Sequence, residues 1–284
     1  MKRRELTERA AFWAIRSVTY FVVFVVGYIV FDIVYHGLPV INWEFIFGFP
    51  KRSGAEGGIL PAILGTLYLV LGTIAVALPL GVAAAIYLNE YASQGRFNRA
   101  VRLAIVTLAG VPSIVFGLFG LGLFVLFFNF GASILAGSLT LACMILPTII
   151  VASEESLRAV PQSLREGSLA LGATKWQTIY KNVLPYSIPG MLTGTILGIG
   201  RAAGETAPIL LTVAAFYLPK LPNSIFDQVM ALPYHLYILA TQHPEGTAVR
   251  PMQYGTALVL LLLVLGVSLT AILLRTRMRR RCRW

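Results

Sequence analysis

The 284-residue chain is 57% hydrophobic and only 12% charged, with a formal net charge of +11 and a mean hydropathy of +0.77. Soluble domains carry about 25% charged residues, so this composition excludes an ordinary soluble protein. Apolar runs long enough to cross a bilayer recur, which predicts an all-α polytopic membrane protein. Most basic residues flank these runs, so we expect the positive charge to meet a lipid bilayer and no nucleic acid.

Six membrane spans are expected, in one transmembrane domain over residues 12–275. It lies between a basic N-terminus, residues 1–11, and a basic tail, residues 276–284. The spans are predicted at about 12–35, 60–88, 103–128, 131–152, 187–217 and 255–274. A polar insertion, residues 153–186, separates the fourth and fifth spans. The first apolar run is too long for the core of a signal peptide, so we expect it to be retained.

Basic residues are distributed unevenly between the two faces. Six spans place both termini on one side, together with the insertion. Eighteen of the 23 Lys and Arg residues fall on that side, and four fall on the other. The positive-inside rule therefore predicts cytoplasmic termini and a cytoplasmic insertion.

Cysteine and histidine give no sign of a disulfide or a metal site. Cys143 lies in an apolar run and Cys282 in the basic tail, so we expect no bond between them. The histidines His36, His235 and His243 are scattered over the outer loops without the spacing of metal ligands. We expect them to be surface residues.

The polar insertion predicts two helices joined by a glycine. Pro161 is suited to the first turn of a helix, and Gly172 is a typical helix end. Thr174 and Gln177 have the spacing of a capping box, which begins a second helix. We expect that helix to end at Pro185. This helix–glycine–helix segment, residues 161–185, is called the elbow below.

Small residues on the elbow would allow another protein to approach closely. They are Gly167, Ser168, Ala170 and Ala173. One interpretation is therefore a docking surface. The alternative is an ordinary amphipathic loop that lies on the lipid headgroups.

Two charges lie inside the fifth predicted span. Arg201 and Glu205 are four residues apart and share a helix face. An ion in mid-bilayer costs roughly 3 kcal/mol, so such residues usually face a cavity or a partner. Pro208 then disturbs the helix just beyond them. The pairs Gly194 with Gly198, and Gly200 with Gly204, mark faces where another helix could come close.

A guanidinium fork matches tetrahedral oxyanions by two-point hydrogen bonding. We therefore expect Arg201 to meet an anion. Glu205 would repel a fully ionised anion but accept a hydrogen bond from a protonated one, which suits hydrogen phosphate better than sulfate. The alternative is an ion pair that neutralises itself and holds helices together.

Several residues within or beside the spans are candidates for a gate or for lining a pathway. They are Pro112, Ser113, Pro147, Thr148, Glu154 and Pro208. The alternative is that these prolines only bend helices, as is common in membrane bundles.

The elbow resembles the EAA loop of bacterial ABC importer permeases. The resemblance lies in the spacing of Glu166-Gly167-Ser168, Gly172 and Leu184-Pro185. The chain departs from the pattern at Gly167, Ser168 and Asn182, where the family has two alanines and an isoleucine. The resemblance implies that the elbow docks on a separate ATPase through residues that include Glu166, Gly167, Ser168, Leu171, Gly172, Ala173 and Thr174.

No phosphate-binding Gly-x-x-x-x-Gly-Lys-Ser/Thr sequence occurs in the chain. We therefore expect this chain to bind no cofactor itself, and ATP with Mg²⁺ to bind the partner ATPase.

The segment 200–210 resembles the permeases of phosphate-specific (Pst) ABC importers, and its Glu-Thr-Ala-Pro continuation resembles their PstA-type subunits. Further matches lie at 57–68, 84–92 and 110–120. The resemblance implies a MetI-like fold with six transmembrane helices and a coupling helix between helices 4 and 5. It also implies a substrate pathway formed by Arg201, Glu205 and Thr206. Many members carry an arginine three residues before Glu154, where this chain has Val151.

The implied function is a permease that imports phosphate by alternating access in the bacterial inner membrane. The implied partners are a PstC-type permease, two copies of a PstB-type ATPase and an external PstS-type phosphate-binding protein. One alternative is a permease for another oxyanion, such as molybdate or sulfate. A second is a membrane-embedded enzyme, although no catalytic constellation is present in the sequence.

Overall fold

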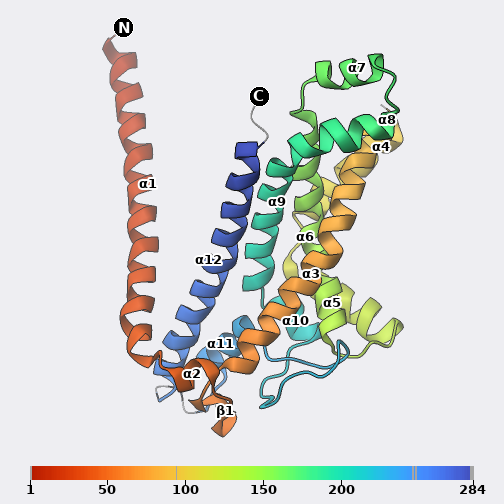
Figure 1. Ribbon diagram of the computed structural model, residues 1–284. Helices are drawn as coiled ribbons and strands as arrows, with labels where there is room; N and C mark the ends of the chain where they lie inside the picture. The colour runs from red at the N-terminus through yellow and green to blue at the C-terminus, as the bar shows by residue number, and fades with distance from the viewer. Residues whose placement is uncertain (1, 94, 245, 247, 282–284) are drawn as a thin grey trace.

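The computed structural model describes residues 2–93, 95–244, 246 and 248–281. Cys282 and the end of the basic tail lie outside the described residues. Long helices run roughly side by side, with short elements gathered at both ends (Figure 1). The long helices are α1 (Lys2–Gly37), α3 (Leu60–Ile86), α6 (Ile134–Arg158), α9 (Leu184–Gly204) and α12 (Arg250–Arg281).

The shorter elements connect these helices. Before α3 come η1 (Leu38–Val40), α2 (Trp43–Phe47), β1 (Pro50–Lys51), η2 (Arg52–Gly54) and β2 (Glu56–Gly57). Between α3 and α6 come η3 (Tyr87–Tyr91), α4 (Arg96–Leu108), α5 (Ser113–Gly120) and η4 (Leu121–Phe127). The remainder are α7 (Gln162–Ala170), α8 (Lys175–Thr178), η5 (Ile179–Val183), α10 (Ala207–Thr212) and α11 (Leu232–Thr241). The segments η3, η4 and η5 are π-helical.

Five helices in the described part of the chain are long and apolar enough to cross a membrane, and a bent pair makes a sixth. The five are 11–40, 60–91, 134–158, 175–204 and 250–277. The sixth is α4 followed by α5 and η4, which meet at 103°. The third span, expected at 103–128, is therefore a bent pair of helices and not one straight helix. Pro112 explains the break, because proline disfavours helix at the residue before it.

The fifth span is also shorter than expected. We expect a helix over 187–217, but α9 ends at Gly204 and only the single short helix α10 follows. Pro208 accounts for the break, since its ring clashes with the carbonyl four residues earlier, at Gly204. Beyond Thr212 the chain is irregular and packs on the start of α6, where the Ser133 N–H donates to the Thr212 carbonyl at 3.0 Å.

Helix α6 is the centre of the bundle, and α3 and α9 pack against it. Most of its residues are buried, among them Leu141, Ile145 and Ile149. Glycines allow the close approach: a Cβ atom at Gly194 would collide with Ala152, and one at Gly81 would collide with Ile149. The predicted packing face at Gly194 and Gly198 is confirmed, since both lie against α6. The face at Gly200 and Gly204 has no such close packing: a Cβ atom at Gly200 meets only Ser268, at 3.8 Å, and one at Gly204 has nothing within 4 Å.

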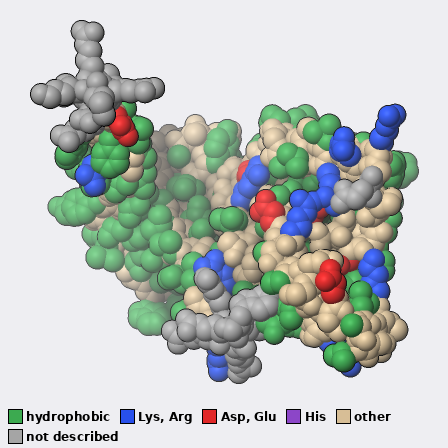
Figure 2. All heavy atoms as spheres, turned by 90° about the horizontal axis from the view of Figure 1, so that it is seen from above, with side chains coloured by type: hydrophobic (Ala, Val, Ile, Leu, Met, Phe, Trp, Pro, Cys, Tyr) green, Lys and Arg blue, Asp and Glu red, His purple; other side chains and the backbone are tan. Residues whose placement is uncertain are grey.

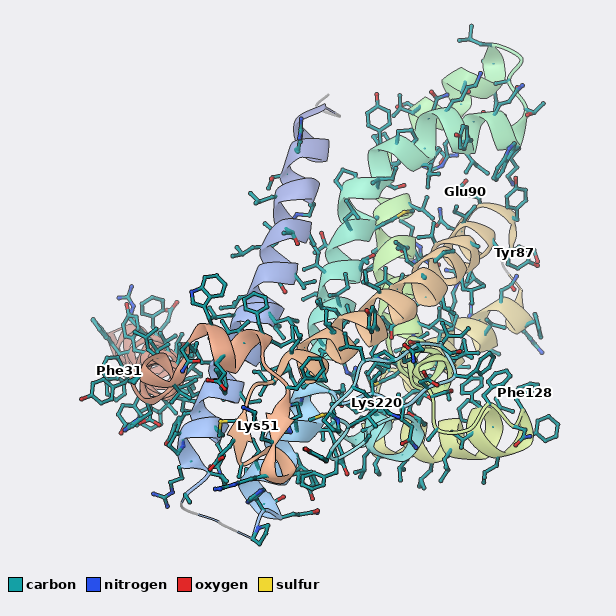
Figure 3. The ribbon with its side chains drawn as sticks, turned by 60° about the horizontal axis from the view of Figure 1, so that its bottom comes forward. Phe31, Lys51, Tyr87, Glu90, Phe128 and Lys220 are labelled. Carbon is teal, nitrogen blue, oxygen red and sulfur yellow. The ribbon has the colours of Figure 1, made fainter. Side chains whose placement is uncertain are left out.

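Different short elements lie at the two ends of the bundle. Both termini lie at the same end as α7 and α8, whereas α2, β1 and α11 lie at the other (Figure 1). Viewed from the terminal end, Lys and Arg side chains are spread over the bundle (Figure 2). Lys51 and Lys220 belong to the opposite end, away from Glu90 (Figure 3). Helix α1, which carries Phe31, joins the bundle through α12, where Gly37 packs against Leu258.

His235 is not a surface residue, contrary to our expectation. It lies in α11 with 1% of its surface exposed, against Gly54 in the loop before α3. Neither ring nitrogen has a hydrogen-bond partner among the described residues. Burial, together with the nearby His243, lowers the pKa of His235 from 6.5 to about 4. The apolar context of Leu232 and Leu239, rather than loop polarity, decides its position.

This burial predicts a pH-dependent stability of the α11 end. Folded His235 stays neutral at pH values where the unfolded chain has already bound a proton. Stability is therefore complete above about pH 6.5 and falls as the pH approaches 4, by up to about 3 kcal/mol. Thermal unfolding of the purified protein between pH 7.5 and 4.5 measures this. His235→Leu should flatten the profile, and an equally steep profile in the variant would contradict the assignment.

Candidate functional site

The elbow has the local structure that its sequence predicts. Gly172 lies between α7 and α8 with φ of 84°, in the left-handed region that favours glycine. The capping box is confirmed, because the Gln177 N–H donates to Thr174 Oγ1 at 3.3 Å and the Thr174 N–H donates to Gln177 Oε1 at 2.9 Å. A helix, a glycine and a second helix therefore follow one another as expected.

The second arm of the elbow does not end at Pro185. Residues 175–204 form one continuous but bent helix, in which α8 passes through the π-helical turn η5 into α9. Pro185 lies in the first turn of α9, directly after η5. A π-turn shifts the hydrogen-bond register, and such shifts occur where a helix bends or accommodates an irregular residue. The elbow is thus joined directly to the span that carries Arg201.

Most of the expected coupling residues are open to solvent. Leu171 is 91% exposed, and nothing lies within 4 Å of a Cβ atom built at Gly167 or Gly172. Ser168 and Ala173 are half-buried, while Glu166 and Thr174 are exposed. An apolar side chain this exposed, flanked by glycines, is suited to a protein partner.

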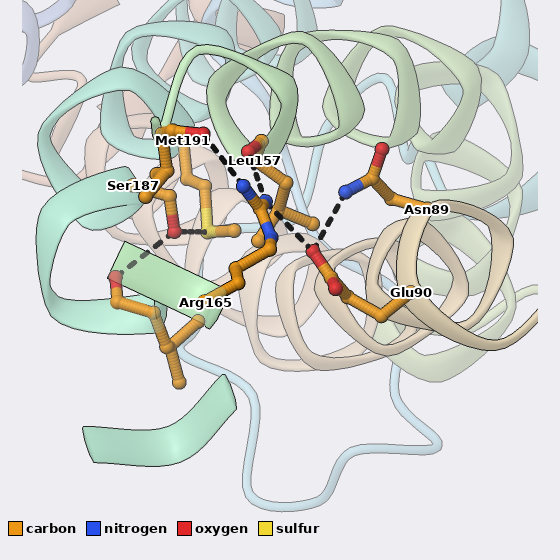
Figure 4. Close-up of polar contacts among 8 residues, drawn as sticks. Asn89, Glu90, Leu157, Arg165, Ser187 and Met191 are labelled. Carbon is orange, nitrogen blue, oxygen red and sulfur yellow. Dashed lines mark hydrogen bonds and ion pairs between the residues drawn. The ribbon is translucent and has the colours of Figure 1, made fainter. Parts of the chain in front are cut away.

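A buried ion pair attaches the elbow to the end of α3. Arg165 of α7 donates to Glu90 Oε1 at 2.9 Å, with side chains only 12% and 8% exposed (Figure 4). The same guanidinium donates to the carbonyls of Leu157 at 2.8 Å and Val160 at 2.6 Å. Asn89 donates to the same carboxylate oxygen at 2.8 Å. This cluster borders a cavity of about 620 Å³ between η3, the end of α6 and the elbow.

Glu154 is held by two arginines at the same end of the bundle. Its Oε1 lies 2.8 Å from Arg102 of α4 and 2.6 Å from Arg158, and the residue is 8% exposed. Arg102 also donates to the Leu88 carbonyl at 2.6 Å. The structure therefore gives the carboxylate a basic partner from α4, although Val151 supplies none. Glu154 thus joins α6 to α4, and Arg102 joins α4 to η3.

Arg201 and Glu205 meet where α9 ends. Arg201 Nε lies 3.4 Å from Glu205 Oε1, and the side chains are 38% and 19% exposed. Arg201 is on the face of α9 that carries the exposed Leu197, away from the buried contacts with α6. Glu205 has extended backbone geometry and Thr206 precedes the short helix α10. The pair thus occupies the end of an interrupted span, on an uncovered face.

The proline-containing candidates fall into two groups. Pro112 and Ser113 start α5, which packs against the start of α10, where a Cβ atom at Gly117 would lie 3.1 Å from the Pro208 Cα atom. The two interrupted spans therefore meet. Pro147 and Thr148 instead lie within the unbroken α6, with Pro147 buried. No group of three potential metal ligands occurs among the described residues.

Sequence reasoning missed Glu90, Arg102 and Arg165 as parts of this end. The partners of Arg165 include a carboxylate 75 positions away. The sequence offered only a weak signal for this pairing, namely that Glu90 is an acidic residue near the end of an apolar run and close to basic loops. Such a pattern indicates that the carboxylate needs a basic partner, but it does not indicate which residue that partner is.

Comparison with known proteins defines the class of the chain. Residues 77–284 match the family model of the binding-protein-dependent transport system inner membrane component. The fold is similar to a chain of the MetNI methionine ABC transporter in an inward-facing form, with a TM-score of 0.59 and 17% identity over 78% of this chain and 94% of that one. It is also similar to a chain of a bacterial alginate ABC transporter, with a TM-score of 0.63 and 15% identity over 94% and 93%.

Sequence relatives narrow the assignment. The phosphate transport system permease protein PstA 1 of Mycobacterium tuberculosis is 40% identical over 228 residues, which are 79% of this chain and 72% of that protein. The probable phosphate transport system permease protein PstA of Methanocaldococcus jannaschii is 33% identical over 265 residues, or 93% and 92%. A probable ABC transporter permease of Bacillus subtilis, YqgI, is 33% identical over 253 residues, or 84% and 85%.

The chain is a multi-pass membrane subunit of an ABC importer with a MetI-like fold, and it belongs to the binding-protein-dependent transport system inner membrane components. Within them it belongs to the PstA permease family. Its relatives and structural neighbours are transport subunits rather than enzymes, and members of this class work with an ATPase and a binding protein.

The Arg165–Glu90 cluster yields a test of how the elbow is held. Replacing one member of a buried pair costs about 3–5 kcal/mol, because the other charge is left uncompensated. Arg165→Met should destabilise more than Glu90→Gln, since it also removes the donors to two backbone carbonyls. Thermal unfolding of the purified variants measures the order. Exposed Arg52→Ala serves as a control with little effect, and equal stabilities for all three variants would contradict this role.

Proposed function

We propose that the chain is the permease subunit of an ATP-driven phosphate importer, which moves inorganic phosphate into the cell by alternating access. One observation carries the proposal: the Arg201–Glu205 pair lies at a break in an apolar span, in a chain whose relatives include phosphate permeases. The choice of phosphate as the substrate rests on the names of those relatives, and the hydrogen-bonding chemistry of the pair is suited to it.

Arg201 cannot face lipid without a large cost. Its side chain is 38% exposed, and Glu205 at 3.4 Å neutralises it only in part. A guanidinium in the bilayer centre costs about 2.5–3.5 kcal/mol even on the most lenient scales. We therefore expect this face of α9 to be covered by a second permease or to line the pathway between the two.

The pair offers complementary hydrogen bonding for hydrogen phosphate. Arg201 would donate two hydrogen bonds to phosphate oxygens. Glu205 would accept a hydrogen bond from a protonated phosphate oxygen, and it would repel anions that carry no proton. Thr206, the next residue, adds a hydroxyl at the same break. The other interrupted span lies beside this break, because α5, which begins after Pro112 at Ser113, packs against α10 at Pro208.

The proposed partners are a PstC-type permease, two PstB-type ATPases and an external PstS-type phosphate-binding protein. The elbow would dock on one ATPase, where ATP and Mg²⁺ bind. The end with the termini and the elbow would be cytoplasmic, in the bacterial inner membrane, as the excess of Lys and Arg supports.

Arg201→Ala should abolish phosphate uptake in cells that lack other phosphate importers, while the complex still assembles. Arg201→Lys should retain only part of the uptake, because an ammonium group lacks the guanidinium fork. Uptake of radiolabelled phosphate, with sulfate and molybdate as competitors, measures both.

The matched control is Arg52→Ala, which breaks an exposed ion pair with Glu56 at the other end of the bundle. It should transport normally. Normal uptake by Arg201→Ala would remove the anion-binding role from that residue, and strong competition by sulfate or molybdate would indicate another oxyanion as the substrate.

Gly172→Val should uncouple ATP hydrolysis from transport. Space is available for a side chain there, but a β-branched residue is strained at φ of 84°. Gly172→Asn keeps the left-handed conformation accessible and should retain most of the coupling. Proteoliposomes that contain the complex give both rates. Tight coupling in the valine variant would show that the geometry of this turn is unimportant.

A further inference from the structure

A cluster of three polar side chains joins the two arms of the elbow. Ser168 of α7 lies 2.9 Å from Thr178, hydroxyl to hydroxyl, and the Asn182 side-chain amide donates to Ser168 Oγ at 2.9 Å. Thr178 and Asn182 are four residues apart on the second arm and share a face. The three residues, called the arm bridge below, thus connect one residue of the first arm to two of the second.

The two arms differ in how they are attached to the bundle. The second arm is embedded, because Thr178, Ile179 and Val183 are 3%, 1% and 0% exposed. Val183 belongs to an apolar cluster with Leu157 of α6. The first arm, α7, buries none of its nine residues, all of which are described. Of its apolar residues, only the half-buried Leu164 packs against that cluster, so the position of α7 depends mainly on a few polar contacts.

Those contacts lie at two places along α7. Arg165 holds its first half to the end of α3, and Ser168 holds its second half to the second arm. The connection at Gly172 is a short turn with open space around it. With the arm bridge broken, the free half of α7 could pivot about Arg165 and Gly172 without moving the second arm.

We propose that the arm bridge makes the elbow one rigid lever, with Asn182 and Ser168 as positioning residues for coupling. Asn182 lies in η5, where α8 bends into α9. A displacement of α7 then moves the start of α9 at Leu184, and α9 transmits this movement along its length to Arg201. This inference rests on the proposed function, since the lever matters only if an ATPase moves it.

The first experiment measures the rigidity of the lever directly. Spin labels are attached to cysteines introduced at the exposed positions Ala170, in the second half of α7, and Trp176, in the full-length chain within its purified complex, with the native cysteines replaced. Pulsed electron resonance gives the distribution of distances between the arms. We expect one narrow distribution in the parent and a clearly broader one in Ser168→Ala and in Asn182→Ala. Unchanged widths would overturn the proposal.

The second experiment is a double-mutant cycle on coupling. The readout is the number of ATP molecules hydrolysed for each phosphate imported by proteoliposomes. Asn182→Ala should raise this ratio about fivefold, the change that the loss of one neutral hydrogen bond supports. Ser168→Ala should raise it at least as much, because it also removes the contact with Thr178. The double variant should be no worse than the worse single one, because both changes break the same bond. Additive effects would contradict a shared bridge.

Conservative and neighbouring variants separate positioning from a general structural role. Ser168→Thr keeps the hydroxyl and should keep both the narrow distribution and the low ratio. Lys181→Ala, next to Asn182 but exposed, should behave like the parent. A raised ratio in Lys181→Ala would show that any change on this arm disturbs coupling, which would overturn the specific role of the bridge.

The two experiments also distinguish this inference from the proposed function. If the complex imports no phosphate, the proposed function fails, and the distances between the labels still decide whether the bridge holds the arms. If import occurs and the distributions do not broaden, the bridge is overturned and the proposed function stands.

Discussion

The buried guanidinium of Arg165 is the contact on which the end of the bundle with the elbow depends. It bonds Glu90 and two backbone carbonyls, so it joins the first arm of the elbow to the ends of α3 and α6 at once. Helix α7 has no fully buried residue, and only Leu164 adds apolar packing, so such polar anchors largely fix its place. The second group at this end, Glu154 with Arg102 and Arg158, fixes α4 in the same manner.

One bent helix and its packing partners connect the Arg165 anchor to the Arg201–Glu205 pair. The second arm bends through η5 into α9, and α9 lies against α6 through glycines such as Gly194. Well-packed interfaces of this kind shift as units rather than deform. α9 ends at Gly204, so a movement of its head is delivered next to Glu205, where the helix is interrupted. One helix therefore connects the proposed docking surface at one end to the Arg201–Glu205 pair at the other.

Sequence reasoning predicted what is local and missed what is distant. The turn at Gly172 and its capping box follow from the chemistry of neighbouring residues, and both are confirmed. Pro208 predicted a disturbed helix, but the residues after it are still apolar, so the end of α9 at Gly204 was not predicted. Hydropathy alone does not distinguish a helix from a buried irregular segment. The pairing of Arg165 with Glu90 was out of reach, since it joins residues 75 positions apart. His235 was misplaced for the same reason: its burial is a property of tertiary packing.

The most direct test of the central claim is the ATPase rate of the complex that co-purifies with this chain, in lipid nanodiscs. The external binding protein is added empty, loaded with phosphate or loaded with sulfate. The account predicts a several-fold rise in ATP hydrolysis with the phosphate-loaded protein alone. A rate that is the same in all three conditions, or the absence of any ATPase from the purified complex, would contradict it.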